Sequence, residues 1–152
     1  MLVRVDFMDL GDTLSVLSGA LRRFPAVHVG LRYGDYYLTV NRGEVSSWRP
    51  ATSAERVLSK YITSSFVIDP PDHDPVLVSL LGEGHTVSSI PWMVTTELMM
   101  LLPLNLKRTT CVGVVSTALR AMGIPISTTN PVVLHRFLRS CEYCNEQTKH
   151  HI

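Results

Sequence analysis

The chain has 152 residues, of which 45% are hydrophobic and 18% are charged, which suits a single domain with an ordinary buried core. The net charge of +1 excludes the strong overall field that indicates a nucleic-acid or anionic-membrane partner. The N-terminus lacks the apolar run of a secretory signal, and the longest apolar region is too short and too polar to span a bilayer. We therefore expect no signal segment and no membrane span.

The first predicted elements are a helix and a β-hairpin. Apolar residues at helical spacing predict a helix over residues 12–24. Alternating patterns then predict strands over 27–33 and 36–41, joined by a two-residue turn, Gly34-Asp35. Glycine at the first turn position is typical of a type II′ turn, so we expect a β-hairpin here.

The rest of the sequence predicts further helices and strands, which together indicate an α+β protein. Helices are predicted over 52–61, 92–102, 111–122 and 131–140, and further strands over 65–69 and 76–81. Thr109 or Thr110 would cap the third of these helices, and Asn130 or a nearby threonine the fourth. We expect one domain over residues 1–140, with a small antiparallel sheet packed with helices, followed by a polar C-terminal tail over residues 141–152.

Cys111 falls in the first turn of the predicted 111–122 helix. There it meets unpaired backbone N–H groups and the positive end of the helix dipole, and both favour the thiolate over the thiol. A reactive cysteine is built in this way. The alternative is a small buried cysteine that only fills space, which is common in protein interiors.

His28 lies within a predicted strand, so the register of the hairpin determines which residues face it and share its side of the sheet. With Gly34 and Asp35 in the turn, Leu31 faces Leu38, and His28 faces Asn41. Alternation then puts Val29, Leu31, Leu38 and Val40 on one face of the hairpin, and puts His28, Gly30, Thr39 and Asn41 on the other.

This register gives His28 and Asn41 candidate catalytic roles. A general-base histidine needs a third group that fixes its ring, and an asparagine carboxamide can accept from the ring N–H. Cys111, His28 and Asn41 would then be the nucleophile, the base and the orienting residue. The alternatives are a strand histidine that bonds a backbone carbonyl and an asparagine that is simply polar near a turn.

Two stretches resemble a known family. "HVGLRYGDYYLTVNRGEV" is similar to the histidine motif, and "TTCVGVVSTAL" to the cysteine-helix motif, of the circularly permuted papain-like hydrolases in the NlpC/P60 superfamily. This group includes YiiX-like proteins and relatives of lecithin:retinol acyltransferase. "TTNPVVLHRFL" is similar to a segment of small phage or viral members. The resemblance implies a permuted papain-like architecture and a cysteine-dependent hydrolase or acyltransferase, such as a thiol protease or amidase, that needs no cofactor.

The motifs also depart from the family. YiiX-like proteins usually carry a glutamate in the second strand, where this chain has Val40 and Asn41, and the acyltransferase relatives usually carry an asparagine where this chain has Thr110. The third catalytic residue and the bond cleaved, whether amide, isopeptide or ester, therefore stay open. A second hypothesis is an inactive papain-like viral or phage protein that acts as a binding module.

The resemblance and the cysteine content also indicate a class of substrate and a cellular compartment. The resemblance implies a peptide or acyl substrate, and nothing in the sequence indicates nucleic acid or an oligomeric state. An odd number of cysteines, three, favours a reducing compartment. We expect a cytoplasmic protein, located in the host cytoplasm or the virion if the chain is viral.

Two further features are candidates for binding. Cys141 and Cys144, with His150, have part of the pattern of a zinc site, although the spacing to the histidine is short and a plain polar tail is the alternative. Trp48 and Arg49 follow the hairpin and are candidates for lining a substrate groove, with simple packing as the alternative.

Overall fold

The computed structural model describes residues 2–8, 28–41, 43–70, 73–87, 108–141 and 144–148. Its main element is a six-stranded sheet in the order β4-β3-β2-β1-β5-β8, in which every neighbouring pair is antiparallel. The strands are β1 Val3–Met8, β2 His28–Tyr33, β3 Tyr36–Thr39, β4 Ser47–Pro50, β5 Ile62–Ile68 and β8 Cys144–Thr148. Two short strands, β6 Thr86–Val87 and β7 Arg108–Thr109, form a separate parallel pair.

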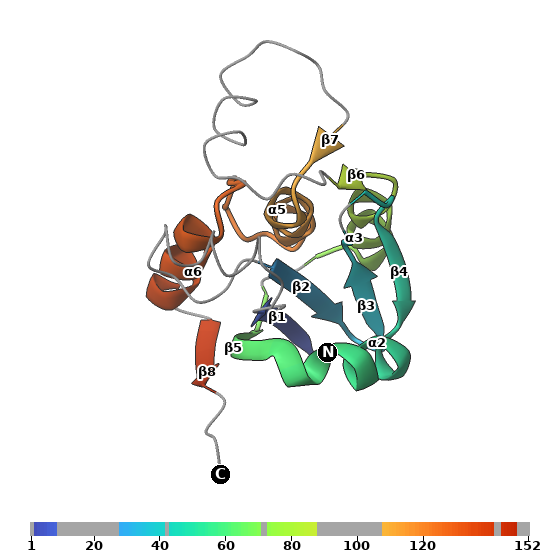
Figure 1. Ribbon diagram of the computed structural model, residues 1–152. Coiled ribbons are helices and arrows are strands. Elements are labelled where there is room, and N and C mark those ends of the chain that lie inside the picture. The colour runs from blue at the N-terminus through green and yellow to red at the C-terminus, as the bar shows by residue number, and fades with distance from the viewer. Residues whose placement is uncertain are drawn as a thin grey trace.

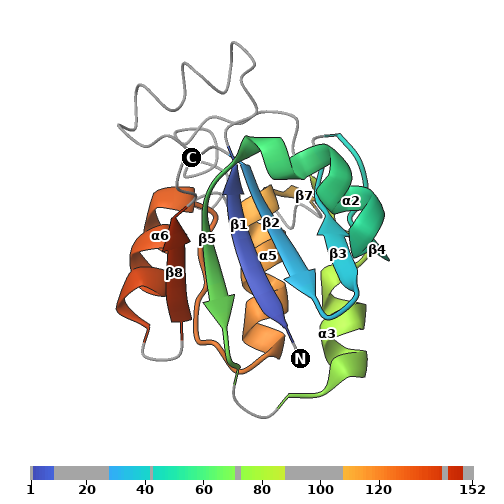
Figure 2. The ribbon, with the colours of Figure 1, turned by 90° about the horizontal axis from the view of Figure 1, so that it is seen from below.

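Helices cover both faces of the main sheet. They are α2 Ala51–Leu58, which continues into the 3₁₀ turn η1 Ser59–Tyr61, then α3 Pro75–Gly82, α5 Cys111–Ala121 and α6 Pro131–Ser140. In Figure 1, α3, α5 and α6 lie on one side of the sheet and α2 on the other. Figure 2 gives the view from the α2 side, with α5 behind β1 and β2. The predicted α+β class is confirmed.

The main core lies between the sheet and α3, α5 and α6. Val29, Leu31, Leu38 and Val40 all belong to it, as the predicted register of the hairpin requires. Tyr33 pairs with Tyr36 and Leu31 with Leu38, and Gly34 has a φ of 60°, a left-handed conformation that glycine adopts without strain. The hairpin prediction is confirmed. We call this side of the sheet the core face and the other side the outer face.

The segment 76–81 is helical, so the prediction of a strand there was wrong. A short continuous apolar run cannot by its pattern distinguish a buried strand from a helix. The deciding residues precede the run. The side chain of Asp74 accepts a hydrogen bond from the Val76 N–H at 2.9 Å, and Pro75 occupies the first helical position, where its missing N–H costs nothing.

Of the other predicted elements, some are confirmed, one is wrong and two lie outside the described residues. The predicted 52–61 helix corresponds to α2 and η1, and α5 and α6 lie where helices were expected. Residues 144–148, expected in a polar tail, form β8 and pair with β5 at the edge of the sheet. The predicted helices 12–24 and 92–102 lie outside the described residues. Within the part of the chain that is described, no helix has the length and apolar character needed to cross a membrane.

His135 shows how a histidine of α6 joins the core. Its ring lies edge-on to Phe7 and Phe66, with centroid distances of 4.9 and 5.1 Å. Burial lowers the pKa of His135, and Arg139 lowers it further, while Glu146 opposes both. This histidine therefore packs between α6 and the sheet as a mainly neutral ring.

Candidate functional site

Cys111 is the first residue of α5, as predicted. The side chain of Thr110 accepts a hydrogen bond from the Gly113 N–H at 3.1 Å and so caps the helix, and the same hydroxyl donates to the carbonyl of Thr129 at 3.4 Å. Cys111 is half-buried and packs against the core cluster. Its thiol is not part of the disulfide, which joins the other two cysteines.

Thr110→Ala should lower the free energy of unfolding by about 1 kcal/mol, because the Gly113 N–H loses its partner at the helix start. Thr110→Ser keeps a hydroxyl at the same place and should retain most of this stability. Urea denaturation monitored by circular dichroism measures both variants. An alanine variant as stable as the native chain would contradict the capping role.

His28 is the first residue of β2 and is 5% exposed. Alternation along the strand puts it on the outer face with Gly30, since Val29 and Leu31 point into the core. Together with Asn41 and Arg49, it lines a pocket of about 290 Å³ that Ser53 and Val57 of α2 also line. We call this the α2 pocket.

Asn41 lies beyond the end of β3, outside the paired part of the hairpin. Its side-chain Nδ2 donates to the carboxylate of Glu44 at 3.3 Å, and its carbonyl accepts from the Glu44 N–H at 3.2 Å. The amide nitrogen is thus directed to Glu44, and Oδ1 is the atom with which Asn41 would accept from an imidazole. The structure brings His28 and Asn41 to the same pocket.

Cys111 and His28 lie at the same end of the sheet. α5 packs against β2, and both elements begin at that end, as Figure 2 shows. However, α5 covers the core face, whereas alternation directs the imidazole of His28 to the outer face. For the Cys111 sulfur to contact the His28 ring, the two side chains would therefore have to meet around the beginning of β2, because they start on opposite faces of the sheet.

A buried polar network on the outer face was not predicted from the sequence. Asp6 is fully buried, and its carboxylate accepts hydrogen bonds from Tyr37 at 2.9 Å and Ser65 at 2.6 Å. Arg4 adds two more, at 2.9 and 3.2 Å. The signal was available, because Arg4 and Asp6 are two residues apart in an alternating strand and therefore share a face.

The candidate zinc ligands adopt another arrangement. Cys141 and Cys144 form a disulfide between the end of α6 and the start of β8, so neither sulfur is a thiolate that could bind zinc. His150 lies outside the described residues. Among the residues that the structure describes, no group of three or more histidine, cysteine, aspartate and glutamate side chains is arranged to hold a metal ion.

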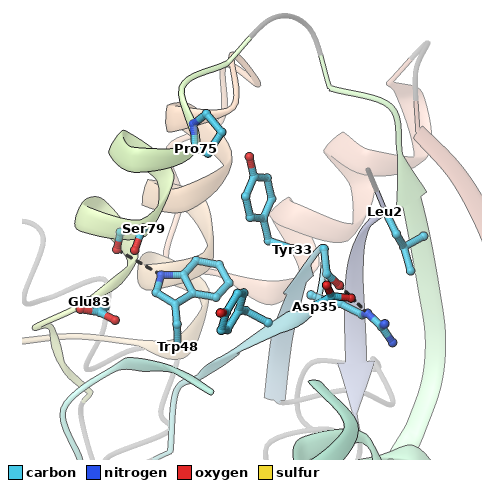
Figure 3. A pocket seen from close by; sticks show the side chains of 10 residues that line it. Leu2, Tyr33, Asp35, Trp48, Pro75, Ser79 and Glu83 are labelled. Carbon is cyan, nitrogen blue, oxygen red and sulfur yellow. Dashed lines mark hydrogen bonds between the residues drawn. The ribbon is translucent and has the colours of Figure 1, made fainter. Parts of the chain in front are cut away.

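Trp48 and Arg49 line two different pockets. Arg49 lines the α2 pocket, whereas Trp48 lines a larger one of about 840 Å³ beside the β2–β3 turn and α3. We call the second the hairpin pocket. Figure 3 shows Tyr33 and Trp48 in this pocket, between Asp35 on one side and Glu83 on the other. Of the residues that line it, Trp48 was predicted to line a groove, whereas Gly34 and Asp35 were predicted as the turn of the hairpin.

Comparisons with known proteins add no relative. The chain matches no protein-family model, no curated protein and no solved structure.

Proposed function

We propose that the protein is a cysteine-dependent hydrolase or acyltransferase, with Cys111 as the nucleophile and His28 as the base. The observation that carries the proposal is the position of Cys111. A thiol that is not in a disulfide heads an 11-residue helix, and this helix packs on the strand that begins with His28. The dipole of α5 favours the thiolate at this position.

The reaction follows from these two groups. His28 takes the thiol proton, and the sulfur attacks the carbonyl carbon of an amide or ester. Backbone N–H groups at the start of α5 stabilise the oxyanion. The leaving amine or alcohol departs with the proton held by His28, which leaves a thioester on Cys111. Water then hydrolyses the thioester, or an acceptor amine or alcohol takes the acyl group. Asn41 would orient the His28 ring through Oδ1.

Alkylation kinetics test the proposed pair. At pH 6, iodoacetamide should modify Cys111 at least about 10-fold faster than N-acetylcysteine in the same solution, because an ordinary thiol is almost fully protonated there. His28→Ala should remove most of this advantage. Mass spectrometry of the digested protein locates the adduct and gives the rate. His85→Ala is the matched control, since the His85 ring bonds the Leu81 carbonyl at 2.7 Å in the α3–β6 segment.

Acyl transfer is tested separately with p-nitrophenyl acetate. The native chain should accumulate an acetyl group on Cys111, whereas Cys111→Ser and His28→Ala should not. If Cys111 is alkylated at the same rate as N-acetylcysteine and is not acetylated, the proposal that the protein is an enzyme is wrong.

The second candidate is a binding module without turnover. It is favoured by the assignment of His28 to the outer face, while α5 covers the core face. In that case His28→Ala and His85→Ala should alkylate at the same rate as the native chain. The two candidates thus predict opposite results from one measurement.

A further inference from the structure

The hairpin pocket has a fixed aromatic wall. The rings of Tyr33 and Trp48 lie 6.1 Å apart with an angle of 57° between their planes. The Trp48 indole N–H donates to the carbonyl of Ser79 at 3.1 Å, as the dashed line in Figure 3 shows. A Cβ on Gly82 would lie 2.8 Å from the indole nitrogen, so the absence of a side chain there lets Trp48 pack against α3.

Tyr33 brings an unpartnered polar atom to this wall. The residue is 8% exposed, and its buried hydroxyl has no hydrogen-bond partner among the described residues. Burial raises the pKa of Tyr33, and the nearby carboxylate of Asp74 raises it further, so the phenol stays protonated at neutral pH. A buried hydroxyl without a partner costs about 1–3 kcal/mol. A ligand group that bonds this oxygen would recover part of that cost.

The charge around the pocket is mainly negative. Asp35 and Glu83 line it from opposite sides in Figure 3, and Arg32 is the cationic residue among its described lining. The Nε of Arg32 donates to the carbonyl of Gly34 at 3.0 Å, which directs part of the guanidinium to the turn. Aromatic rings beside carboxylates attract organic cations, through the ring quadrupole and through direct charge.

We propose that the hairpin pocket binds an alkylammonium group, with the carbon chain against Tyr33 and Trp48 and the charged end near Asp35 or Glu83. An ammonium group has three N–H donors and no acceptor, which suits a pocket lined by two carboxylates and by a tyrosine whose hydroxyl has no partner among the described residues. The group can belong to a lysine side chain of a peptide or to a small free amine. This site lies at the turn end of β2, away from Cys111, and does not depend on the proposed reaction.

Three small probes test the site by two-dimensional ¹H–¹⁵N NMR. Nα-acetyl-lysine methylamide should shift the Trp48 indole and Gly34 amide signals, saturating with a Kd on the order of 1–10 mM. Nα-acetyl-norleucine methylamide, which lacks the charge, should bind at least about 5-fold more weakly. Butylammonium distinguishes the sources: equal affinity indicates a free amine, and affinity at least about 5-fold weaker than the lysine derivative indicates a peptide.

Tyr33→Phe is the sharpest variant. It removes one hydroxyl that lacks a partner in the described structure, so the melting temperature should stay the same or rise. Affinity for the lysine derivative should nevertheless fall at least about 3-fold, and the pair Asp35→Asn with Glu83→Gln should weaken it further. Tyr61→Phe, outside the pocket, is the control and should bind normally. Equal binding of the norleucine compound, or unchanged affinity in Tyr33→Phe, would overturn the proposal.

Discussion

Replacement of Asp6 by alanine should lower the free energy of unfolding by about 3–5 kcal/mol, the largest effect on stability that we expect from one side chain. The Asp6 carboxylate is fully buried and accepts hydrogen bonds from Arg4, Tyr37 and Ser65. Alanine removes the carboxylate that these three residues share as an acceptor, and with it the ion pair of the partly buried Arg4. Urea denaturation at neutral pH measures the loss.

Milder variants keep this prediction testable if Asp6→Ala does not fold. Tyr37→Phe and Ser65→Ala each remove one of the bonds to Asp6 and should cost about 1.5–3 kcal/mol, the range for bonds to a charged group. Asp69→Ala is the matched control, because Asp69 is an exposed carboxylate at the end of β5 and should change stability by less than about 0.5 kcal/mol. Equal midpoints for the Asp6 and Asp69 variants would show that the network does not stabilise the fold.

Local signals predicted the elements that are defined by their own residues. The hairpin was predictable because the turn residues Gly34 and Asp35 and the alternation around them specify a single register. The start of α6 was predictable for a similar reason, since Asn130 caps the Val132 N–H at 2.9 Å. In each case the deciding contacts join residues only a few positions apart.

Elements that depend on distant partners were not predictable. The segment 144–148 is polar and becomes a strand because the edge of β5 offers it backbone hydrogen bonds. Asp6 is tolerated in the interior because Tyr37 and Ser65 reach it from β3 and β5. Such pairings are specified by tertiary structure, which no local pattern contains.

In the candidate site too, local patterns predicted the positions of single residues, whereas the arrangement of the elements depends on tertiary packing. The sequence placed Cys111 at a helix start and His28 on the face opposite Val29, and both positions depend on local pattern. Which face of the sheet α5 covers depends on the packing of its apolar residues. Val112, Val115 and Leu119 join the core with Val29 and Leu31, so α5 covers the core face. Periodicity identifies the buried side of a helix but not the surface that buries it.

Gly30→Ala is expected to destabilise the protein by about 2–3 kcal/mol, although glycine-to-alanine changes often stabilise where the backbone allows a side chain. Gly30 lies directly beside Asp6 across the β1–β2 pairing. A Cβ there would lie 2.9 Å from both the Met8 Cε and the Tyr37 Cε1, and closer still to the Tyr37 hydroxyl. Tyr37 reaches Asp6 across the space that this glycine leaves open.

Tyr37 has little room to move, because it is 1% exposed and its hydroxyl is bonded to Asp6. The new methyl group should therefore push the ring and weaken the Asp6 bond as well. A double-mutant cycle measures this coupling: in a Tyr37→Phe background, where the closest atom and the bond are both absent, Gly30→Ala should cost at least about 1 kcal/mol less than in the native chain. Additive costs would show instead that the methyl group acts mainly on Met8 and on the ring carbons of residue 37, which phenylalanine retains.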